Sequence, residues 1–518
     1  MAQFYDAAII GGGPAGSTAA TVLARAGRSV VVFEKEKFPR FHVGESLLPF
    51  TLPIFDRLGL SEKIRAAGFQ EKYGAFFWNE ASGGTRPVVF EKSWDDRHPR
   101  AYQVKRADFD QLLLRHSEES GAIVREETAV AEVLFEEGRA VGVVAHGVAG
   151  GEEVRAKVVV DASGQTAFLS RKLGTRRFDS KLKRAAVFAH YEGVPRPSGR
   201  PAGDILLPVD EGVWYWIIPF SDGTASVGAV FEPEVVRAGE GETLEQRFER
   251  LIARSARMAE LLAGGRRASK VFGISDYSAA SAKLRGDGYV LVGDAATFLD
   301  PVFSTGVFLA MATGVRAADA IDRALVKHGR VDARDLKAYE RETNRIVARF
   351  RRFVYAFYDP LFFEAFCTEA PLESMRAAVT SVLAGGVEKV PFAARAWMSL
   401  MFLGIGFDRW RRRLLRLPPT EAAAGRWESR VKSRESRAGA RRQCPGFHPQ
   451  PVGSFRAAPS SGPASLVGTL RPGRYQKEVG RRWSLSRSRS PAKGRVRLAP
   501  SLIASFGRRS RRRGSHTN

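Results

Sequence analysis

The chain has 518 residues, more than one hydrophobic core usually holds, so two or more domains are expected. Its two cysteines, Cys367 and Cys444, exclude a disulfide framework and match no metal motif, which favours a reducing, cytoplasmic setting. The net charge of +25 would suggest nucleic-acid binding, but residues 421–518 hold 23 Lys and Arg against 4 Asp and Glu, and residues 1–420 carry a net of only +6.

The N-terminal ten residues have no basic stretch before their apolar one, and they predict a first strand rather than a signal peptide. No uncharged apolar run reaches the roughly 20 residues that cross a bilayer. The nearest, residues 396–407, predicts a packed helix, so no integral membrane association is expected.

A glycine-rich loop, Gly11-Gly12-Gly13-Pro14-Ala15-Gly16, follows the first strand and precedes an Ala-rich helix over 17–26. Gly11 permits the tight turn, Gly13 and the neighbouring Ala15 allow close approach of a pyrophosphate, and Gly16 allows close packing of helix on sheet. Glu34, at the end of the second strand, is placed to bind a ribose hydroxyl. Strand, loop, helix, strand and acid in this order predict a dinucleotide site.

The rest of the chain divides by pattern. Residues 1–175 and 286–330 alternate strands and helices and predict a discontinuous, doubly wound (Rossmann-like) α/β domain. Residues 176–285 predict an antiparallel-sheet substrate domain, and 331–417 an aromatic-rich helical C-terminal region. Residues 418–518, rich in Arg, Ser, Pro and Gly, predict a disordered basic tail. An RNA-binding arm is the alternative for this tail, but no specific nucleic-acid partner is expected.

Three further motifs resemble those of the FAD-dependent monooxygenase superfamily: Val158–Gly164, Val290–Ala296 and Arg106 ahead of a Leu-rich helix. The resemblance implies that Asp294 contacts the ribityl chain of FAD and that Arg106 lies on the isoalloxazine or phosphate side. Residues 147–151 are interpreted as a loop, not as a second dinucleotide unit for a nicotinamide. A separate flavin reductase is therefore expected to supply FADH2.

Four segments narrow the class of flavoprotein: Phe38–Pro49, Phe69–Ala75, Trp214–Pro219 and Phe298–Gly306. The first contains Arg40, Glu45 and Ser46, and the second contains Lys72. Over residues 5–415 the chain resembles the flavin-dependent halogenases, and it leans toward the branch acting on phenols and pyrroles. Arg40 and Ser46 then belong to the loop that lies along the flavin.

The resemblance implies that reduced FAD, dioxygen and chloride or bromide produce hypohalous acid, which a lysine carries to an electron-rich ring. Lys72 takes that role, as a haloamine or a hydrogen-bond donor. Glu45 assists proton transfer or positions the end of the tunnel through which hypohalous acid reaches the lysine. The Thr305 and Gly306 amides bind the halide, while Trp214 and Trp216 separate flavin from substrate.

Plainer interpretations stay open for these residues. Lys72 could be a surface lysine, and Glu45 a surface or N-cap residue. Trp214 and Trp216 could be core aromatics, and Ser304 a simple N-cap.

Phe303 stands where the tryptophan-specific branch has an acidic residue, which argues against free tryptophan as substrate. A phenol or pyrrole, free or tethered to a carrier protein in secondary metabolism, is expected instead. The alternative is an FAD-dependent monooxygenase or a geranylgeranyl-reductase-like oxidoreductase that does not halogenate.

Overall fold

The structure is a computed structural model that describes residues 3–148, 150–234, 236, 239, 241–367 and 373–386, with isolated positions at 396, 399, 403, 404 and 411. The predicted basic tail and most of residues 387–417 lie outside the described residues. So does most of the apolar stretch at 396–407.

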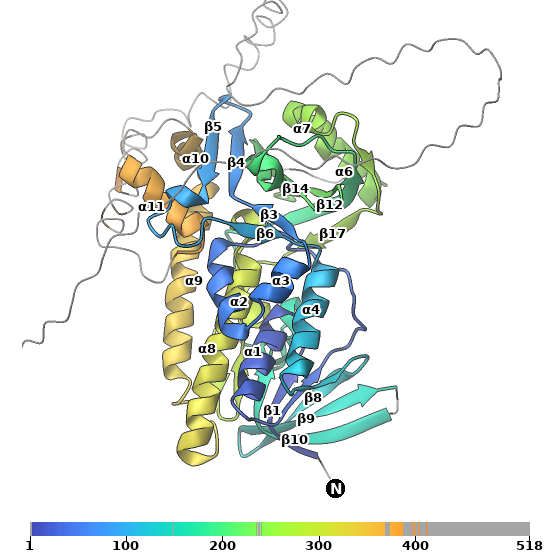
Figure 1. The fold of residues 1–518 in the computed structure, drawn as a ribbon, viewed down its shortest axis with the longest axis vertical. Coiled ribbons are helices and arrows are strands. Elements are labelled where there is room, and N and C mark those ends of the chain that lie inside the picture. The colour runs from blue at the N-terminus through green and yellow to red at the C-terminus, as the bar shows by residue number, and fades with distance from the viewer. Residues whose placement is uncertain are drawn as a thin grey trace, which may run out of the picture. The chain divides into compact units, whose positions relative to one another are not determined.

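A mainly parallel sheet carries the glycine-rich loop (Figure 1). Its strand order is β19-β20-β10-β1-β2-β7, and β1, β2, β7, β10 and β20 run parallel. Strands such as β2 are buried at every position, as expected of a sheet covered on both faces. The strands are β1 (Gln3–Ile10), β2 (Val30–Phe33), β7 (Ile123–Arg125), β10 (Gly150–Asp161), β19 (Arg285–Gly286) and β20 (Tyr289–Leu291).

The predicted loop at residues 147–151 is wrong. Strand β9 (Arg139–Gly147) ends there and pairs antiparallel with β10, with Gly147 opposite Gly150, and β8 (Ala129–Glu136) adds to the other edge of β9. Gly147, Gly150 and Gly151 hid the strand ends because glycine has low strand propensity. The segment is a hairpin rather than a turn leading into a helix.

Helices α1 (Pro14–Arg25), α4 (Arg106–Glu119) and α8 (Thr305–His328) lie side by side in the same part of the molecule (Figure 1). Small residues let α1 and α8 approach closely: a Cβ on Gly314 of α8 would lie 2.6 Å from the carbonyl oxygen of Ala15. This contact joins residues 305–328 to the glycine-rich loop, and the predicted α/β class with a Rossmann-like FAD-binding domain is confirmed.

A second sheet has the order β16-β12-β15-β14-β13-β4-β5, with β17 also paired to β12. Residues 74–89, expected in the first domain, supply two of its strands, and β4 pairs parallel with β13. A pairing between segments this far apart leaves no local pattern in the sequence. The strands are β4 (Gly74–Asn79), β5 (Thr85–Val89), β12 (Ala185–Glu192), β13 (Ile205–Asp210), β14 (Val213–Pro219), β15 (Thr224–Phe231), β16 (Arg266–Arg267) and β17 (Phe272–Ser275).

The two faces of the second sheet bury different residues, because side chains alternate along a strand. Tyr215 and its β14 neighbours Val213 and Ile217 pack against α6 (Leu244–Arg254) and α7 (Ala256–Leu261). Trp214 and Trp216 belong to the core on the opposite face.

Shorter elements complete the fold. They are α2 (Leu52–Leu58), α3 (Ser61–Ala66), α5 (Phe168–Lys172), β3 (Gln70–Lys72) paired with β6 (Ala101–Gln103), and the small sheet of β11 (Arg176–Phe178), β18 (Ala279–Ser281) and β21 (Thr297–Phe298).

Helices α9 (Lys337–Phe357), α10 (Pro360–Cys367) and α11 (Glu373–Leu383) follow α8. Their aromatic side chains are mostly buried in the core that also holds Trp214, so core packing accounts for them. Among the described residues, no helix is both long and apolar enough to cross a membrane.

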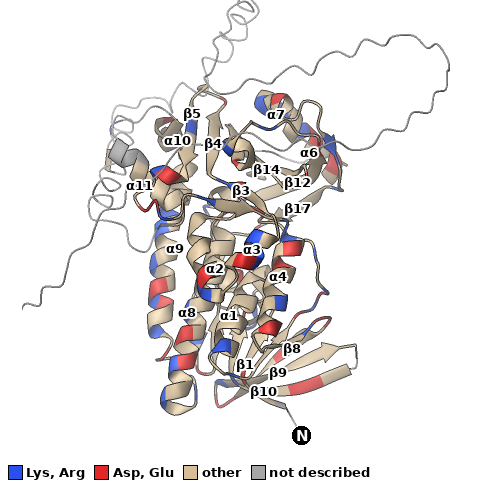
Figure 2. Cartoon of the chain, viewed as in Figure 1, with Lys and Arg blue, Asp and Glu red and all other residues tan. Residues whose placement is uncertain are grey.

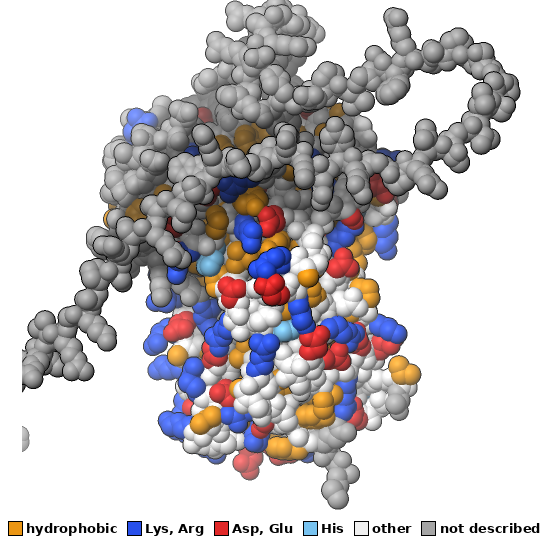
Figure 3. Space-filling model, viewed as in Figure 1, with side chains coloured by type: hydrophobic (Ala, Val, Ile, Leu, Met, Phe, Trp, Pro, Cys, Tyr) orange, Lys and Arg blue, Asp and Glu red, His pale blue; other side chains and the backbone are white. Residues whose placement is uncertain are grey.

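Basic and acidic residues are interspersed along α8 and α9 (Figure 2). On the face shown in Figure 3 the two kinds likewise mix over the described residues and do not gather by sign. The described residues of this face therefore form no continuous basic surface of the kind that binds nucleic acid.

Candidate active site

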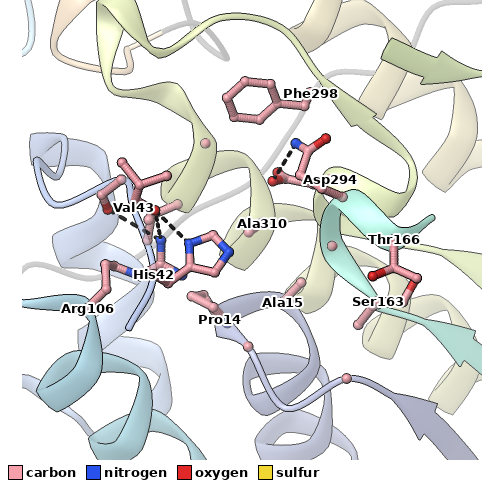
Figure 4. Close-up of a pocket in the computed structure, with 18 of the residues that line it drawn as sticks. Pro14, Ala15, His42, Val43, Arg106, Ser163, Thr166, Asp294, Phe298 and Ala310 are labelled. Atoms are coloured by element: carbon pink, nitrogen blue, oxygen red, sulfur yellow. Dashed lines mark hydrogen bonds between the residues drawn. The ribbon is translucent and has the colours of Figure 1, made fainter. Parts of the chain in front are cut away.

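A cavity of about 460 Å³ lies where the carboxyl ends of β1, β2 and β10 approach β14 (Figure 4). Ligands of doubly wound sheets bind at this edge of the strands. Its walls come from the glycine-rich loop, the Phe38–Ser46 segment, α4, the region after β10, β14 and the start of α8.

The glycine-rich loop is shaped for close approach. Gly11 has φ of +100°, and a Cβ there would lie 2.5 Å from the carbonyl oxygen of Ala162. A Cβ on Gly16 would lie 1.9 Å from the carbonyl oxygen of Gly11. Helix α1 begins at Pro14, with no side-chain cap and no acidic residue in its first turn, so its amides remain available to phosphate. Gly11, Gly13 and Ala15 line the cavity, and Gly16 lies behind them.

Glu34 follows β2 directly, is buried and lines the cavity. Its carboxylate accepts hydrogen bonds from the backbone amides of Gly12, at 2.8 Å, and Glu36, at 3.0 Å. These bonds fix the carboxylate beside the loop, at the place where an acid binds ribose hydroxyls.

Two arginines share one buried carboxylate. Arg106 donates to both oxygens of Asp110 at 2.7 and 2.8 Å, and Arg40 donates to the same group at 3.3 Å. Arg106 also donates to the carbonyl oxygen of Val43 at 2.7 Å, which ties α4 to the Phe38–Ser46 segment. Arg106 is 6% exposed, so it is no surface arginine, and a Cβ on Gly13 would lie 3.4 Å from Arg40 Nη2. Both guanidinium groups therefore line the cavity, where they could pair with phosphate groups.

Asp294 lies across the cavity from Arg106 in Figure 4. Its carboxylate accepts a hydrogen bond from Gln165 at 3.0 Å. Burial raises the pKa of Asp294 to about 6, against the opposing effects of Gln165, Arg106 and Arg176. A carboxylate in such a cavity suits the ribityl hydroxyls. Loop, acid, arginines and Asp294 together fit FAD.

Lys72, at the end of β3, is 2% exposed, so it is not a surface lysine. Its Nζ donates to the Ser46 hydroxyl at 2.8 Å and to the carbonyl oxygen of Leu47 at 3.3 Å. Burial lowers the pKa of Lys72 to about 7, and the charge of Asp204 acts in the opposite direction. Ser46 lines the cavity while Lys72 lies one side chain behind it. The amine is therefore partly neutral near pH 7, one hydroxyl away from the cavity.

Glu45 also lines the cavity and is 2% exposed, so neither a surface nor an N-cap role fits it. Its Oε1 accepts a hydrogen bond from His190 Nε2 on β12, at 2.8 Å. Sequence reasoning missed His190 because a lone histidine in a strand has no local signature. It also gave no role to Asp110, although this residue lies four positions after Arg106, the spacing of an ion pair on a helix.

Trp214 and Trp216 both line the cavity and are 3% and 5% exposed, so their shared strand face is confirmed. Trp214 Nε1 donates to the Tyr358 hydroxyl at 3.0 Å, which donates to the buried carboxylate of Asp300 at 2.9 Å. Trp216 Nε1 donates to Ser226 Oγ at 3.1 Å. Both indoles are thus held by hydrogen bonds as well as by packing.

Helix α8 begins at Thr305, as the sequence predicted, but Ser304 is no simple N-cap. It has φ of +55° and its side chain caps no amide. Ser304 and Gly306 line the cavity, and Thr305 is buried beside them without lining it. The first-turn amides therefore lack a side-chain partner, and the Gly306 amide borders the cavity directly.

Comparison with known proteins identifies this arrangement. A family described as FAD binding domain matches residues 5–354. A brominase of Pseudoalteromonas luteoviolacea, named for 1H-pyrrole-2-carbonyl on a peptidyl carrier protein, is 36% identical over 334 residues, covering 63% of this chain and 79% of the relative. A tryptophan 2-halogenase of Chondromyces crocatus is 34% identical over 358 residues, covering 68% of this chain and 67% of the relative.

The structure of the flavin-dependent brominase Bmp2 superposes with a TM-score of 0.70 at 30% identity, covering 79% of this chain and all of that one. The chain belongs to the flavin-dependent halogenases. This halogenase uses FAD and a halide, and it is an oxidoreductase of the FAD-dependent superfamily.

Proposed function

We propose that this halogenase places chlorine or bromine on a phenol or pyrrole ring, free or attached to a carrier protein. A similar protein named for a carrier-bound pyrrole supports the tethered substrate, and Phe303 before α8 supports a ring other than tryptophan. The Phe303 ring packs edge-on against Phe357 at 5.6 Å, so position 303 contributes an apolar ring rather than a carboxylate. A separate flavin reductase supplies the reduced cofactor. The low cysteine content supports a cytoplasmic setting.

The main support for this proposal is the position of Lys72. A lysine buried to this degree is uncommon, and a lowered pKa provides a neutral amine near physiological pH. A neutral amine can accept halogen from hypohalous acid, and a protonated amine can donate a hydrogen bond to it. Ser46 connects Nζ to the cavity in either case.

The other proposed roles follow from position. When bound, reduced FAD would supply electrons that activate dioxygen, and the activated oxygen would oxidise the halide. The Gly306 and Thr305 amides hold the halide at the start of α8, and Trp214 and Trp216 keep the substrate ring from the flavin. The carboxylate of Asp294, the loop at Gly11–Gly16 and the two arginines bind the cofactor.

The test compares wild type with Lys72→Ala, and with Lys63→Ala on the exposed face of α3 as a matched control. Each protein receives a flavin reductase, NADH, FAD, air and chloride or bromide, with phenol and pyrrole carboxylates offered free and carrier-bound. Mass spectrometry should find halogenated product with wild type and Lys63→Ala. Lys72→Ala should still oxidise reduced FAD but give no halogenated product. A halogenated product from Lys72→Ala would remove Lys72 from the mechanism.

A further inference from the structure

Glu45 and His190 form a hydrogen-bonded pair that reaches from the protein surface to the cavity. Glu45 lines the cavity, and its Oε1 lies 2.8 Å from His190 Nε2. The His190 side chain is 20% exposed, against 2% for Glu45. Phe41, itself 42% exposed, and Phe220 meet the imidazole edge-on at 5.8 and 5.5 Å. One end of the pair therefore touches solvent and the other belongs to the cavity wall.

The second oxygen of Glu45 is unused by the protein. Oε2 is buried and has no hydrogen-bond partner among the residues that the structure describes. Buried carboxylate oxygens are nearly always partnered, so this atom is available to a group that enters the cavity. Charged and titratable groups near the pair include Arg106 on α4 and, in the same cavity wall, His42 and Asp294. Toward the surface they include the Lys105–Asp222 ion pair beside Phe220, and Lys270 over Phe272.

The proposed reaction needs protons inside the cavity. Reduced flavin anion, dioxygen, halide and an aromatic C–H consume two protons to give oxidised flavin, the aryl halide and two waters. Without halide, reduced flavin anion and dioxygen consume one proton to give oxidised flavin and hydrogen peroxide. Trp214, Trp216 and Ile218, which line the cavity from β14, carry no group that releases a proton near neutral pH.

We propose that His190 and Glu45 conduct protons from solvent into the cavity, an inference that rests on the proposed function. The Nε2–H bond of the imidazolium breaks as an O–H bond forms on Glu45. Rotation of the carboxyl group then presents that proton to the cavity, where the O–H bond breaks and a reduced oxygen atom takes the proton. The ring keeps its Nδ1–H, so it must turn over to bring the bare Nε2 to solvent, where an N–H bond forms again with a proton from water. No electrons move in these steps.

The test loads the protein with reduced FAD and mixes it with air-saturated buffer without halide in a stopped-flow instrument. A pH indicator records proton uptake as the flavin is oxidised. The variants are His190→Ala and His190→Gln, and His146→Gln on the exposed part of β9 is the matched control. Both His190 variants should slow proton uptake by about tenfold or more. Imidazole should restore the rate of the Ala variant, which has room for it, and not that of the Gln variant. FAD affinity, measured by flavin fluorescence, should be unchanged because His190 does not line the cavity.

A second measurement does not depend on turnover. In the FAD-free protein at low temperature, the His190 N–H that is bonded to Glu45 should give a downfield proton resonance. It should be present in His146→Gln, lost in His190→Gln and shifted upfield in Glu45→Gln. Wild-type proton uptake in both His190 variants, or a resonance that Glu45→Gln leaves unshifted, would overturn the relay. Because no halide is used, failure to find halogenated product would refute the proposed function and leave this result standing.

Discussion

Replacing Lys72 with Met should change how the free energy of unfolding depends on pH. Burial lowers the pKa of Lys72 to about 7, whereas lysine in an unfolded chain titrates near about 10.4. Between these values the unfolded state binds a proton that the folded state does not, so the stability of wild type rises with pH. Below pH 7 both states are protonated and this contribution is constant. One proton gives a slope of about 1.4 kcal/mol per pH unit, or about 4 kcal/mol between pH 7 and 10.

Methionine has a similar length and does not titrate, so Lys72→Met should be more stable than wild type near pH 7 and should lose that advantage by about pH 10. Urea unfolding of FAD-free protein, followed by circular dichroism at several pH values, measures the difference. Lys63→Met provides the baseline for an exposed lysine. A difference between Lys72→Met and wild type that stays constant over this range would show that Lys72 is charged in the folded protein. The argument for a neutral amine would then fail.

Three further substitutions test the site. Asp110→Asn leaves the buried Arg106 guanidinium without its anion and leaves Arg40 only its longer contact with Glu36. It should lower the free energy of unfolding by about 3–5 kcal/mol and weaken FAD binding, and urea unfolding unchanged within error would contradict this. Gly16→Ala places a Cβ 1.9 Å from the Gly11 carbonyl oxygen, so the variant should bind FAD much more weakly in a fluorescence titration, and wild-type affinity would disprove the close packing. Tyr358→Phe leaves Trp214 Nε1 without its acceptor and should cost about 1–3 kcal/mol in the same unfolding assay, with no loss counting against the network.

The sequence predicted the elements whose pattern is local. The antiparallel sheet predicted within residues 176–285 is present in strands β14 and β15, where β-branched and aromatic residues run to Pro219 and Phe231. The glycine-rich loop and Glu34 were predictable because their spacing follows from one strand, one turn and one helix. The same local reasoning placed the start of α8 at Thr305.

The rest depended on contacts between distant segments. Residues 74–89 joined the second sheet through a parallel pairing that no local pattern encodes. Burial of Lys72 required β3, β6 and the Phe38–Ser46 segment to meet, and the Glu45–His190 pair joins residues 145 positions apart. Motif resemblance could name Lys72 and Glu45, but only the assembled structure showed which hydroxyl and which imidazole they use.

The most direct test of the central claim is one mass spectrum of the product formed by wild-type enzyme under isotopically heavy dioxygen in bromide buffer. A flavin-dependent halogenase sends both oxygen atoms to water, so the product should show the bromine isotope doublet and no heavy oxygen. A product that contains heavy oxygen and lacks bromine would contradict the account and identify a hydroxylating enzyme.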